Sequence, residues 1–355
     1  MTLPPIALVI PGSIDTPTGG YRYDRHVVTE LRAFGADVAV LEVGGGFPLP
    51  SQGDVARARA MLESGGRGRV LLVDGLVYSA TNHMAAAIHA LGQPVIALIH
   101  HPLSFEAGLT REQAKMLEVS ECAALAHAQH IVVTSPETRD SLARDFNVPA
   151  DRITVALPGV DRPAIHSPAR PKRRERRWPQ LLTVASFIPR KGYLDLIAAY
   201  ARIADLDWTA TLIGGTTFDP PHVSAVRQAI RDAGLDDRIA LVGAVDQAEL
   251  EAYYADADLF VLPTYYEGYG MAFAEAIVRG LGVIGTTGAA GAIGYGGDLI
   301  TPGDVEALAD CLRRAIATPD GIERLRHMAA TRAPDLPNWQ STAQIFAELV
   351  NAAKF

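Results

Sequence analysis

Short apolar runs, rich in β-branched residues, alternate with longer amphipathic stretches through the first half of the chain. Runs of four to six apolar residues are typical of strands buried on both faces of a parallel sheet. The stretches between them are long enough to form helices that cross over such a sheet. The predicted strands are 6–10, 38–43, 70–73, 95–99 and 131–134. The predicted helices are 21–34, 54–64, 82–91, 111–126 and one from Thr134 or Ser135 to Phe146, in which Pro136 occupies the first turn and Glu137 a capping box.

The alternation stops near residue 158 and restarts near residue 180. The intervening segment combines several prolines with a basic run, a composition typical of an exposed connection. The basic run consists of Arg170, Lys172, Arg173, Arg174, Arg176 and Arg177. Further strands are predicted at 181–185, 210–213, 239–242, 259–262 and 283–285, and a last helix at 340–353.

This pattern predicts an α/β protein with two Rossmann-like parallel-sheet lobes facing a central cleft, since open parallel sheets bind ligands at the carboxyl ends of their strands. The expected organisation is an N-terminal lobe at 1–160, a linker at 161–179, a C-terminal lobe at 180–335 and a final helix at 336–355 that packs back on the first lobe. The residues after the first strand, from Pro11 to Gly20, do not match the GxGxxG pattern of dinucleotide-binding proteins. A nicotinamide-dependent dehydrogenase is therefore disfavoured.

Composition narrows the classes of function further. The 355 residues are 48% hydrophobic and 20% charged, which is typical of a globular protein with two cores. The net charge of −8 argues against nucleic acid as a partner, although the basic run leaves peripheral contact with anionic lipid as an alternative to a solvated linker. Two cysteines in different halves suggest neither a disulfide framework nor a metal site. Because no apolar run is long enough to span a bilayer and the first residues do not resemble a signal peptide, we expect a cytoplasmic protein.

Two glutamates bracket a loop and a helix start that follow the strand predicted at 259–262. Gly268 and Gly270 allow backbone N–H groups to approach a ligand, and a helix from about residue 270 to 279 would present its positive end to phosphate oxygens. Glu267 lies at the start of this segment and Glu275 inside the helix. Carboxylates accept hydrogen bonds from neighbouring hydroxyls, so this arrangement suits a nucleotide sugar. An ordinary acidic helix start, followed by an exposed glutamate, is the alternative.

The segment from Glu267 to Glu275 resembles the E-x7-E motif of glycosyltransferase family 4, a retaining family with the GT-B fold; both glutamates and both glycines match. The resemblance implies that Glu267 orients the hydroxyls of the transferred sugar and Glu275 the ribose. The donor-binding residues expected here are Glu267, Gly268, Tyr269, Gly270, Met271 and Glu275.

A second segment supports the same interpretation. Arg190 and Lys191 precede Gly192 directly after the first strand of the second lobe, and they resemble the R-K-G segment of the family. Cations at a helix N-terminus oppose the helix dipole, so an anionic ligand is the simplest compensation. A guanidinium fork and a mobile ammonium together are suited to a diphosphate. Gly243, after the third strand of this lobe, is expected foremost as a turn and secondarily as a contact of the nucleotide base.

The first lobe is expected to bind the acceptor. By resemblance, Gly19 and Gly20, joined by Gly12, form a loop over the donor phosphates, with a capped helix N-terminus as the alternative. The family often carries a histidine after the strand at 95–99 that contacts the donor sugar, and this position is His100 rather than His101. Asp74 and Glu106 are candidates for contact with the acceptor, but we prefer to interpret them as solvated surface residues.

The resemblance implies transfer with retention of the anomeric configuration, without a protein nucleophile, a cofactor or a metal. The residues expected to act on the reaction are Glu267, His100, Arg190 and Lys191. The acceptor, whether a saccharide, a lipid-linked molecule or a small molecule, is unknown. A nucleotide-sugar epimerase of the same fold and a non-catalytic bilobal binding protein remain the alternatives.

Overall fold

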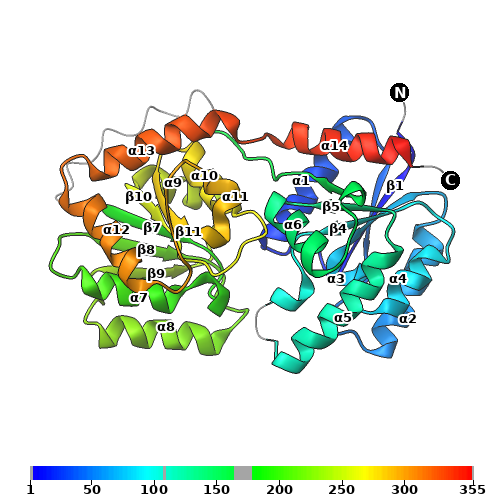
Figure 1. The fold of residues 1–355 in the computed structure, drawn as a ribbon, viewed down its shortest axis with the longest axis horizontal. Coiled ribbons are helices and arrows are strands. Elements are labelled where there is room, and N and C mark those ends of the chain that lie inside the picture. Colours follow the sequence, from blue (N-terminus) through cyan, green and yellow to red (C-terminus); the bar gives the residue numbers. More distant parts are fainter. Residues whose placement is uncertain (1–2, 107–108, 164–177, 354–355) are drawn as a thin grey trace. The chain divides into compact units, whose positions relative to one another are not determined.

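The computed structural model describes residues 3–106, 109–163 and 178–353, and it divides the chain into two compact units (Figure 1). Unit 1 comprises Met1–Gly159 and Pro337–Phe355, and unit 2 comprises Val160–Leu336. The basic run at 170–177 lies outside the described residues, so the linker at 161–179 and the domain boundaries proposed around it stay predictions.

Unit 1 is built on a parallel sheet whose strands lie in the order β2-β1-β3-β4-β5-β6. In Figure 1, α1 and α14 lie on one side of this sheet and α2, α4 and α5 on the other. The strands are β1 (Ile6–Ile10), β2 (Val38–Glu42), β3 (Val70–Asp74), β4 (Val95–Ile99), β5 (His130–Val133) and β6 (Ile153–Val155). The helices are α1 (Gly19–Ala33), α2 (Gln52–Gly65), α3 (Gly75–Tyr78), α4 (Asn82–His89), α5 (Arg111–His127), α6 (Pro136–Asp145) and α14 (Trp339–Ala352).

The last helix of the chain completes the core of unit 1. Trp339, at the start of α14, stacks on His26 of α1 with ring centroids 4.1 Å apart, and it meets Tyr23 edge-on at 5.8 Å. The hydroxyl of Thr342 donates to the backbone carbonyl of Leu157 at 2.7 Å. These contacts attach α14 to the first half of the chain although it is the last element of the sequence.

Unit 2 repeats the architecture with a second parallel sheet in the order β12-β11-β10-β7-β8-β9. In Figure 1, α7, α8 and α12 lie on one side of it and α10 and α13 on the other. The strands are β7 (Gln180–Val184), β8 (Thr209–Ile213), β9 (Ile239–Gly243), β10 (Leu259–Val261), β11 (Gly282–Thr286) and β12 (Asp298–Ile300). The helices are α7 (Tyr193–Arg202), α8 (Pro220–Asp232), α9 (Gln247–Asp256), α10 (Met271–Val278), α11 (Ala290–Ile293), α12 (Val305–Ala317) and α13 (Gly321–Arg332).

The expected α/β class, with one parallel sheet in each half, is confirmed, and each predicted strand matches to within one residue at either end. Two strands were not predicted, β6 and β12, which have three residues each. The capping box proposed for α6 is wrong: Ser135 is the cap and accepts from the N–H of Thr138, so Glu137 stands one position too early to reciprocate.

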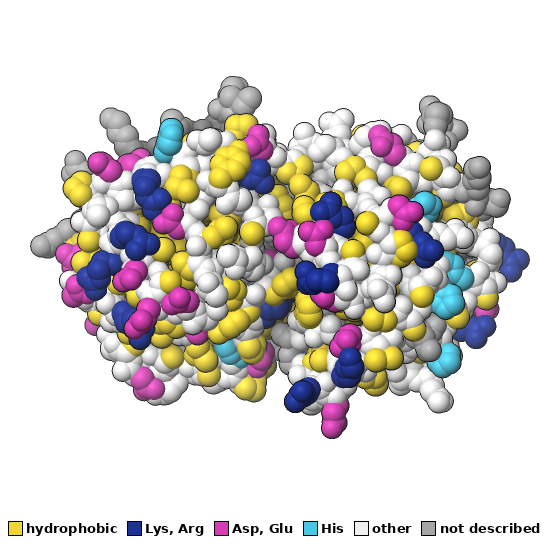
Figure 2. All heavy atoms as spheres, viewed as in Figure 1, with side chains coloured by type: hydrophobic (Ala, Val, Ile, Leu, Met, Phe, Trp, Pro, Cys, Tyr) yellow, Lys and Arg dark blue, Asp and Glu magenta, His cyan; other side chains and the backbone are white. Residues whose placement is uncertain are grey.

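Two surface properties bear on possible partners. Among the described residues, no helix has the length and apolarity that a membrane crossing requires. On the face drawn in Figure 2, Lys and Arg side chains are interspersed with Asp and Glu side chains. That face lacks the broad basic area on which nucleic-acid binding depends.

The strand orders determine where each unit can bind a ligand. In unit 2 the chain runs from β7 outward to β8 and β9 and then returns to place β10 on the other side of β7. In unit 1 the same reversal separates β1 from β3. Loops diverge at such a reversal and leave a crevice at the carboxyl ends of the strands. The segments after β7 and β10, and those after β1 and β3, are therefore the places to examine.

Candidate functional site

In unit 2, the segment after β7 brings two cations to the carboxyl end of the sheet. Pro189–Lys191 form one short 3-10 turn, which Gly192 ends in the left-handed conformation at φ 71° before α7 begins. A Cβ atom at Gly192 would lie 2.1 Å from the carbonyl oxygen of Pro263, so no larger residue fits there. This close approach locks the Arg190–Lys191 turn against the loop that follows β10.

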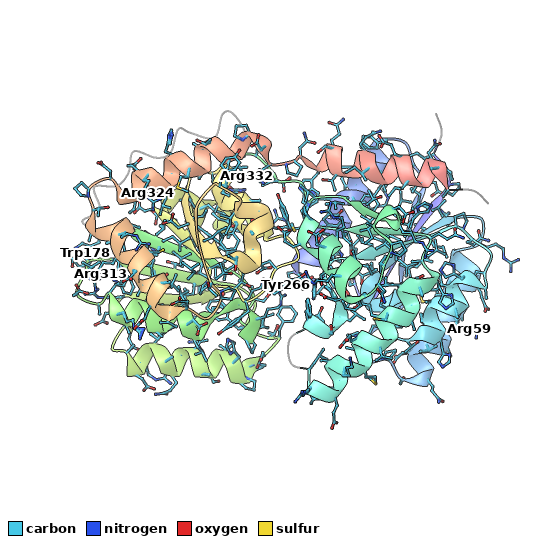
Figure 3. All side chains as sticks on the ribbon, in the orientation of Figure 1. Arg59, Trp178, Tyr266, Arg313, Arg324 and Arg332 are labelled. Atoms are coloured by element: carbon cyan, nitrogen blue, oxygen red, sulfur yellow. The ribbon has the colours of Figure 1, made fainter. Side chains whose placement is uncertain are left out.

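The loop after β10 is tied to the same turn by backbone and side-chain bonds. The N–H of Tyr265 donates to the carbonyl of Arg190 at 2.8 Å, and the hydroxyl of Thr264 donates to the same carbonyl at 3.1 Å. In return, the guanidinium of Arg190 donates to the carbonyl of Tyr266 at 2.5 Å. Tyr266 marks this loop in Figure 3. The two segments, which are far apart in sequence, thus form one rigid surface.

Glu267 is the centre of a nearly buried charge cluster on this surface. Its carboxylate accepts from the ammonium of Lys191 at 2.5 Å and lies 3.7 Å from the guanidinium of Arg190. The side chains of Glu267 and Lys191 are only 11% and 14% exposed. Burial by itself would raise the pKa of Glu267, but the charges of Lys191 and Arg190 outweigh it and hold this pKa below its ordinary value. Among the described residues, this cluster brings two cationic side chains to one carboxylate, and an anion would complete it.

The N-terminus of α10 adjoins this cluster through the backbone. Gly270 caps the helix with φ 97° and offers no side-chain acceptor, so the first N–H groups of α10 are not capped by it. A Cβ atom at Gly270 would approach the ring of Phe273 to 3.1 Å. Gly268 precedes this cap, Tyr269 is buried and Met271 opens the helix. An uncapped helix N-terminus next to two cations is suited to phosphate oxygens.

Glu275 lies on a buried side of α10. It is 5% exposed, and its carboxylate accepts from the phenol of Tyr254 at 3.1 Å. Arg279 stacks on the ring of Tyr254 with its guanidinium carbon 4.8 Å from the ring centroid. The alternative of an ordinary exposed glutamate is therefore wrong, whereas the contact with ribose stays a prediction.

Gly243 ends β9 with φ 93°, and its carbonyl accepts from the N–H of Gly214 at 2.8 Å. This geometry matches the turn expected there. Its contact with a nucleotide base stays a prediction.

In unit 1, the glycine segment after β1 leads directly into α1. Thr18 caps that helix by accepting from the N–H of Tyr21, so Gly19 and Gly20 occupy the first helical turn. Gly12 has φ 73°, and a Cβ atom there would lie 3.5 Å from the hydroxyl of Tyr21. The capped helix start is thus present, and the role of these glycines over donor phosphates stays a prediction.

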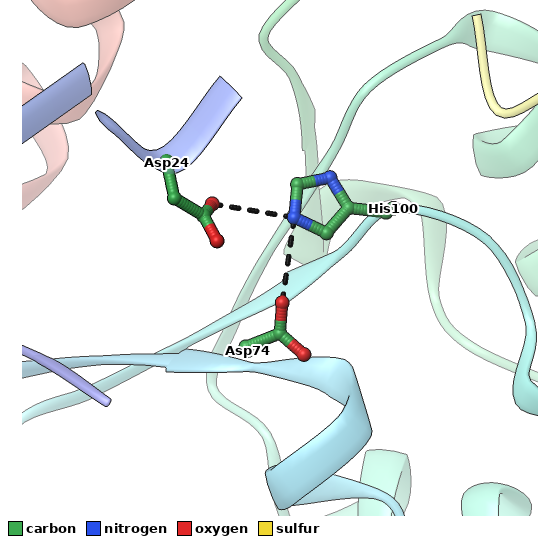
Figure 4. A group of neighbouring side chains, drawn as sticks. All are labelled: Asp24, Asp74 and His100. Atoms are coloured by element: carbon green, nitrogen blue, oxygen red, sulfur yellow. Dashed lines mark ion pairs between the residues drawn. The ribbon is translucent and has the colours of Figure 1, made fainter. Parts of the chain in front are cut away.

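His100 directly follows β4 and lies between two carboxylates, as Figure 4 shows. Its Nε2 is 3.3 Å from Oδ1 of Asp24 and 3.4 Å from Oδ2 of Asp74. The side chains of Asp24 and Asp74 are 0% and 4% exposed, whereas that of His100 is 18% exposed. The interpretation of Asp74 as a solvated residue is therefore wrong. Asp24 was not singled out from the sequence, because nothing in its place within a helix signals a partner on another strand.

The electrostatics of this cluster favour a charged histidine. Burial alone would lower the pKa of His100, but Asp24 and then Asp74 outweigh it and raise this pKa to about 10. The three groups are also ligand types that divalent cations accept, and one ligand atom of each lies within 4.8 Å of the others.

His101 has a different partner from its neighbour. Its Nε2 lies 2.8 Å from Oε1 of Glu106, and both side chains are partly exposed. The two adjacent histidines thus point to separate carboxylates, as the alternation along an extended segment leads one to expect. The preference for His100 over His101 as the ligand contact stays a prediction.

Comparison with known proteins adds family information to this geometry. A family model described as "Glycosyl transferases group 1" matches residues 178–318, and one described as "Glycosyltransferase Family 4" matches residues 75–162; together they cover more than half of the chain. The MMP alpha-(1->4)-mannosyltransferase of Mycolicibacterium hassiacum is 26% identical over 84% of this chain and 74% of its own length. Another curated relative is matched over only 52% of its own length, so the chain spans between about half and three quarters of such relatives.

Solved structures show the same architecture. Sucrose-phosphate synthase from Thermosynechococcus elongatus is similar over 99% of this chain and 100% of its own, with a TM-score of 0.80 at 22% identity. The Anabaena protein HepE, crystallised in complex with UDP-glucose, is similar over 98% of this chain and 100% of its own, with a TM-score of 0.77 at 18% identity. At these identities the likeness establishes the GT-B fold.

Proposed function

Because this chain belongs to glycosyltransferase family 4, with the GT-B fold, we propose that it transfers a sugar from a nucleotide-diphosphate sugar to an acceptor hydroxyl, with retention of the anomeric configuration and without a metal. The main support for a nucleotide-diphosphate donor is the cluster of Arg190, Lys191 and Glu267. It lies at the strand-order reversal of unit 2, next to the uncapped N-terminus of α10.

The diphosphate is the group that this cluster fits best. Arg190 and Lys191 share one carboxylate, so a net positive charge remains for the ligand. The N–H groups at the start of α10 add donors that need no reorientation when phosphate charge builds up. In this proposal the diphosphate binds between the two segments, and Glu267 accepts from hydroxyls of the sugar while Lys191 bridges carboxylate and phosphate.

Retention follows in this proposal from front-face attack. The bond between the anomeric carbon and the diphosphate oxygen breaks, and the oxygen of the acceptor hydroxyl bonds to the same face of that carbon. The departing diphosphate oxygen takes the proton of this hydroxyl, so the protein supplies positioning and charge rather than a nucleophile. The cations and the helix N-terminus take the part that a divalent ion has in other transferases. Glu275 contacts the ribose in this scheme, and Gly243 the base.

Calorimetry with nucleoside diphosphates and monophosphates tests the donor class. Each charge-assisted contact is worth about 1.5 to 3 kcal/mol, so the diphosphate should bind about ten to a hundred times more tightly than the monophosphate. Added EDTA should leave the affinity unchanged. Equal binding of the two nucleotides would refute the diphosphate site.

Product analysis separates the proposal from its alternatives. Incubation of sugar nucleotides with candidate acceptors, such as saccharides, lipid-linked saccharides and small polyols, should yield a glycoside whose anomeric proton coupling shows retention. Conversion of the sugar nucleotide without any acceptor would indicate an epimerase. Binding without turnover against a broad acceptor panel would favour a binding protein.

A further inference from the structure

We propose that Tyr254, Arg279 and Glu251 are positioning residues that hold the carboxylate of Glu275 in the orientation that recognises the ribose of the donor nucleotide. This inference rests on the proposed function, in which Glu275 contacts the ribose, and it adds three side chains that support this contact. All four residues belong to unit 2. None of the three supporting residues lies in the E-x7-E segment or in the R-K-G segment.

The phenol of Tyr254 reaches α10 from the core of unit 2. Tyr254 belongs to α9 and is 1% exposed, and its ring packs on that of Phe260 in β10 with ring centroids 6.4 Å apart. Its hydroxyl donates to Oε2 of Glu275 at 3.1 Å. Because an ionised carboxylate only accepts hydrogen bonds, the direction of this bond is fixed. One oxygen of Glu275 is therefore held by a side chain whose own ring cannot move freely.

Arg279 supports both partners of this hydrogen bond. Its guanidinium carbon lies 4.8 Å from the centroid of the Tyr254 ring, a distance at which a cation and an aromatic ring attract each other. The same guanidinium donates to the backbone carbonyl of Glu275 at 3.0 Å. Arg279 follows Glu275 by four residues and caps α10, so it lies one turn further along the same face of that helix. One side chain thus holds the ring and the helical turn that carries the carboxylate.

Glu251 anchors the guanidinium from α9, the helix that also carries Tyr254. Its carboxylate accepts two hydrogen bonds from Arg279, one of them from Nε at 2.9 Å, and two such bonds fix the plane of the guanidinium. The side chain of Arg279 is only 7% exposed. Burial by itself would lower the pKa of Arg279, but the hydrogen bond and charge of Glu251, and then the charge of Glu275, raise it above its ordinary value.

The consequence for binding is a carboxylate that is already oriented before the nucleotide arrives. A buried carboxylate is costly without a cation nearby, and Arg279 supplies that cation to Glu275 without replacing its hydrogen bonds. The hydroxyls of a ribose are donors that such a carboxylate accepts. Because the side chain loses little rotamer freedom on binding, more of the energy of these hydrogen bonds contributes to affinity. The supporting residues should therefore determine how strongly the protein distinguishes a ribose from a sugar that lacks these hydroxyls.

The test is calorimetry with UDP, GDP and ADP and with their 2′,3′-dideoxy counterparts, which lack both ribose hydroxyls. The wild type should bind its preferred ribonucleotide about ten to a hundred times more tightly than the dideoxy form. Tyr254→Phe, which keeps the packed ring, should lower this ratio about three- to tenfold by weakening the ribonucleotide. Arg279→Gln and Glu251→Gln should lower it in the same direction. The control Tyr253→Phe, the same change at the neighbouring residue of α9, should leave the ratio at the wild-type value.

A double variant separates positioning from a tie that merely holds the two helices together. In Glu275→Gln the ratio should already be low, and adding Tyr254→Phe should lower it no further, because the phenol acts through that carboxylate. An unchanged ratio in Tyr254→Phe, or equal weakening of the ribonucleotide and its dideoxy form, would overturn the inference and leave the proposed donor class intact. Equal binding of both forms by the wild type would instead remove the ribose contact from the proposed function, and the inference with it.

Discussion

Removing Lys191 from unit 2 should destabilise the protein through the partner that it leaves behind. In Lys191→Met the carboxylate of Glu267, 11% exposed, loses its 2.5 Å partner, and Arg190 at 3.7 Å is the cation that remains beside it among the described residues. A methionine fills most of the same volume, so the change is mainly one of charge. The stability of this variant should therefore measure the cost of a buried carboxylate that has lost its ion-pair partner, rather than the cost of a packing defect.

The magnitude follows from the distance and the burial. At an effective dielectric constant of about 20, two unit charges 2.5 Å apart attract by about 7 kcal/mol before the cost of desolvating them is subtracted. Breaking one side of a buried pair typically costs about 3 to 5 kcal/mol, and the remaining Arg190 places this case near about 3 kcal/mol. In a unit of this size that loss lowers Tm by about 6 to 12 °C. Glu267→Gln alone should cost less, about 1 to 2 kcal/mol, because the amide oxygen of the glutamine can still accept a hydrogen bond from Lys191.

A double-mutant cycle in urea unfolding provides the assay. The double variant Lys191→Met, Glu267→Gln no longer contains the carboxylate of Glu267, so its free energy of unfolding should lie closer to the wild type than that of Lys191→Met alone, with a coupling of about 2 kcal/mol. Additive losses would refute the account of Glu267 as a carboxylate that depends on Lys191. Nucleoside diphosphate affinity, measured on the same three variants, should fall in each one that lacks Lys191.

Two further predictions use other features of the described residues. Burial chiefly raises the pKa of the Glu121 carboxyl in α5 to about 8, so the stability that its proton contributes is complete below about pH 4.5 and is lost as the pH rises through 8. Glu121→Gln, which can still accept the 2.7 Å bond from the N–H of Leu103, should therefore have a higher Tm than the wild type near about pH 8.5 but not near pH 4.5. Identical dependence of Tm on pH in the two proteins would contradict this prediction. Gly192→Ala should lower the free energy of unfolding in urea by at least about 3 kcal/mol, because its Cβ atom would overlap the carbonyl of Pro263 and the backbone has φ 71°. The control Gly234→Ala, at φ 65° with open space around it, should lower it by only about 1 kcal/mol. Equal losses would mean that the backbone conformation alone, and not the overlap, determines the loss of stability.

The sheets could be predicted because buried parallel strands need continuous apolar runs, and runs such as Ile6–Ile10 have no other common explanation. β6 and β12 escaped this reasoning because three residues at a sheet edge carry no measurable period. The cations after β7 and the glutamate after β10 were predicted to contact one ligand, the cations at its phosphates and the glutamate at its sugar hydroxyls. Their direct pairing was not, since contact between residues 76 positions apart depends on which strands are neighbours.

The unit 1 cluster shows where this kind of reasoning ends. Asp74 follows a strand, as a ligand contact or a solvated turn residue equally would, so its sequence position does not distinguish the two. Asp24 lies inside α1, where a charged residue normally faces water; only the order of β1, β3 and β4 in the sheet brings it to His100. Burial of a charge is a property of the assembled fold, and a linear pattern does not encode it.

Each unit has a cluster of ionisable side chains beside the reversal of its strand order, but cations predominate in one cluster and carboxyl groups in the other. In unit 2, two cations meet one carboxylate at the reversal between β7 and β10, and this excess of positive charge calls for an anionic ligand. In unit 1, two aspartate side chains meet His100 beside the reversal between β1 and β3, and burial raises the pKa of Asp24. A diphosphate has reason to bind the first cluster and none to bind the second, which contains two buried aspartates. The excess of positive charge in unit 2 thus supports a phosphate ligand there independently of the family motif.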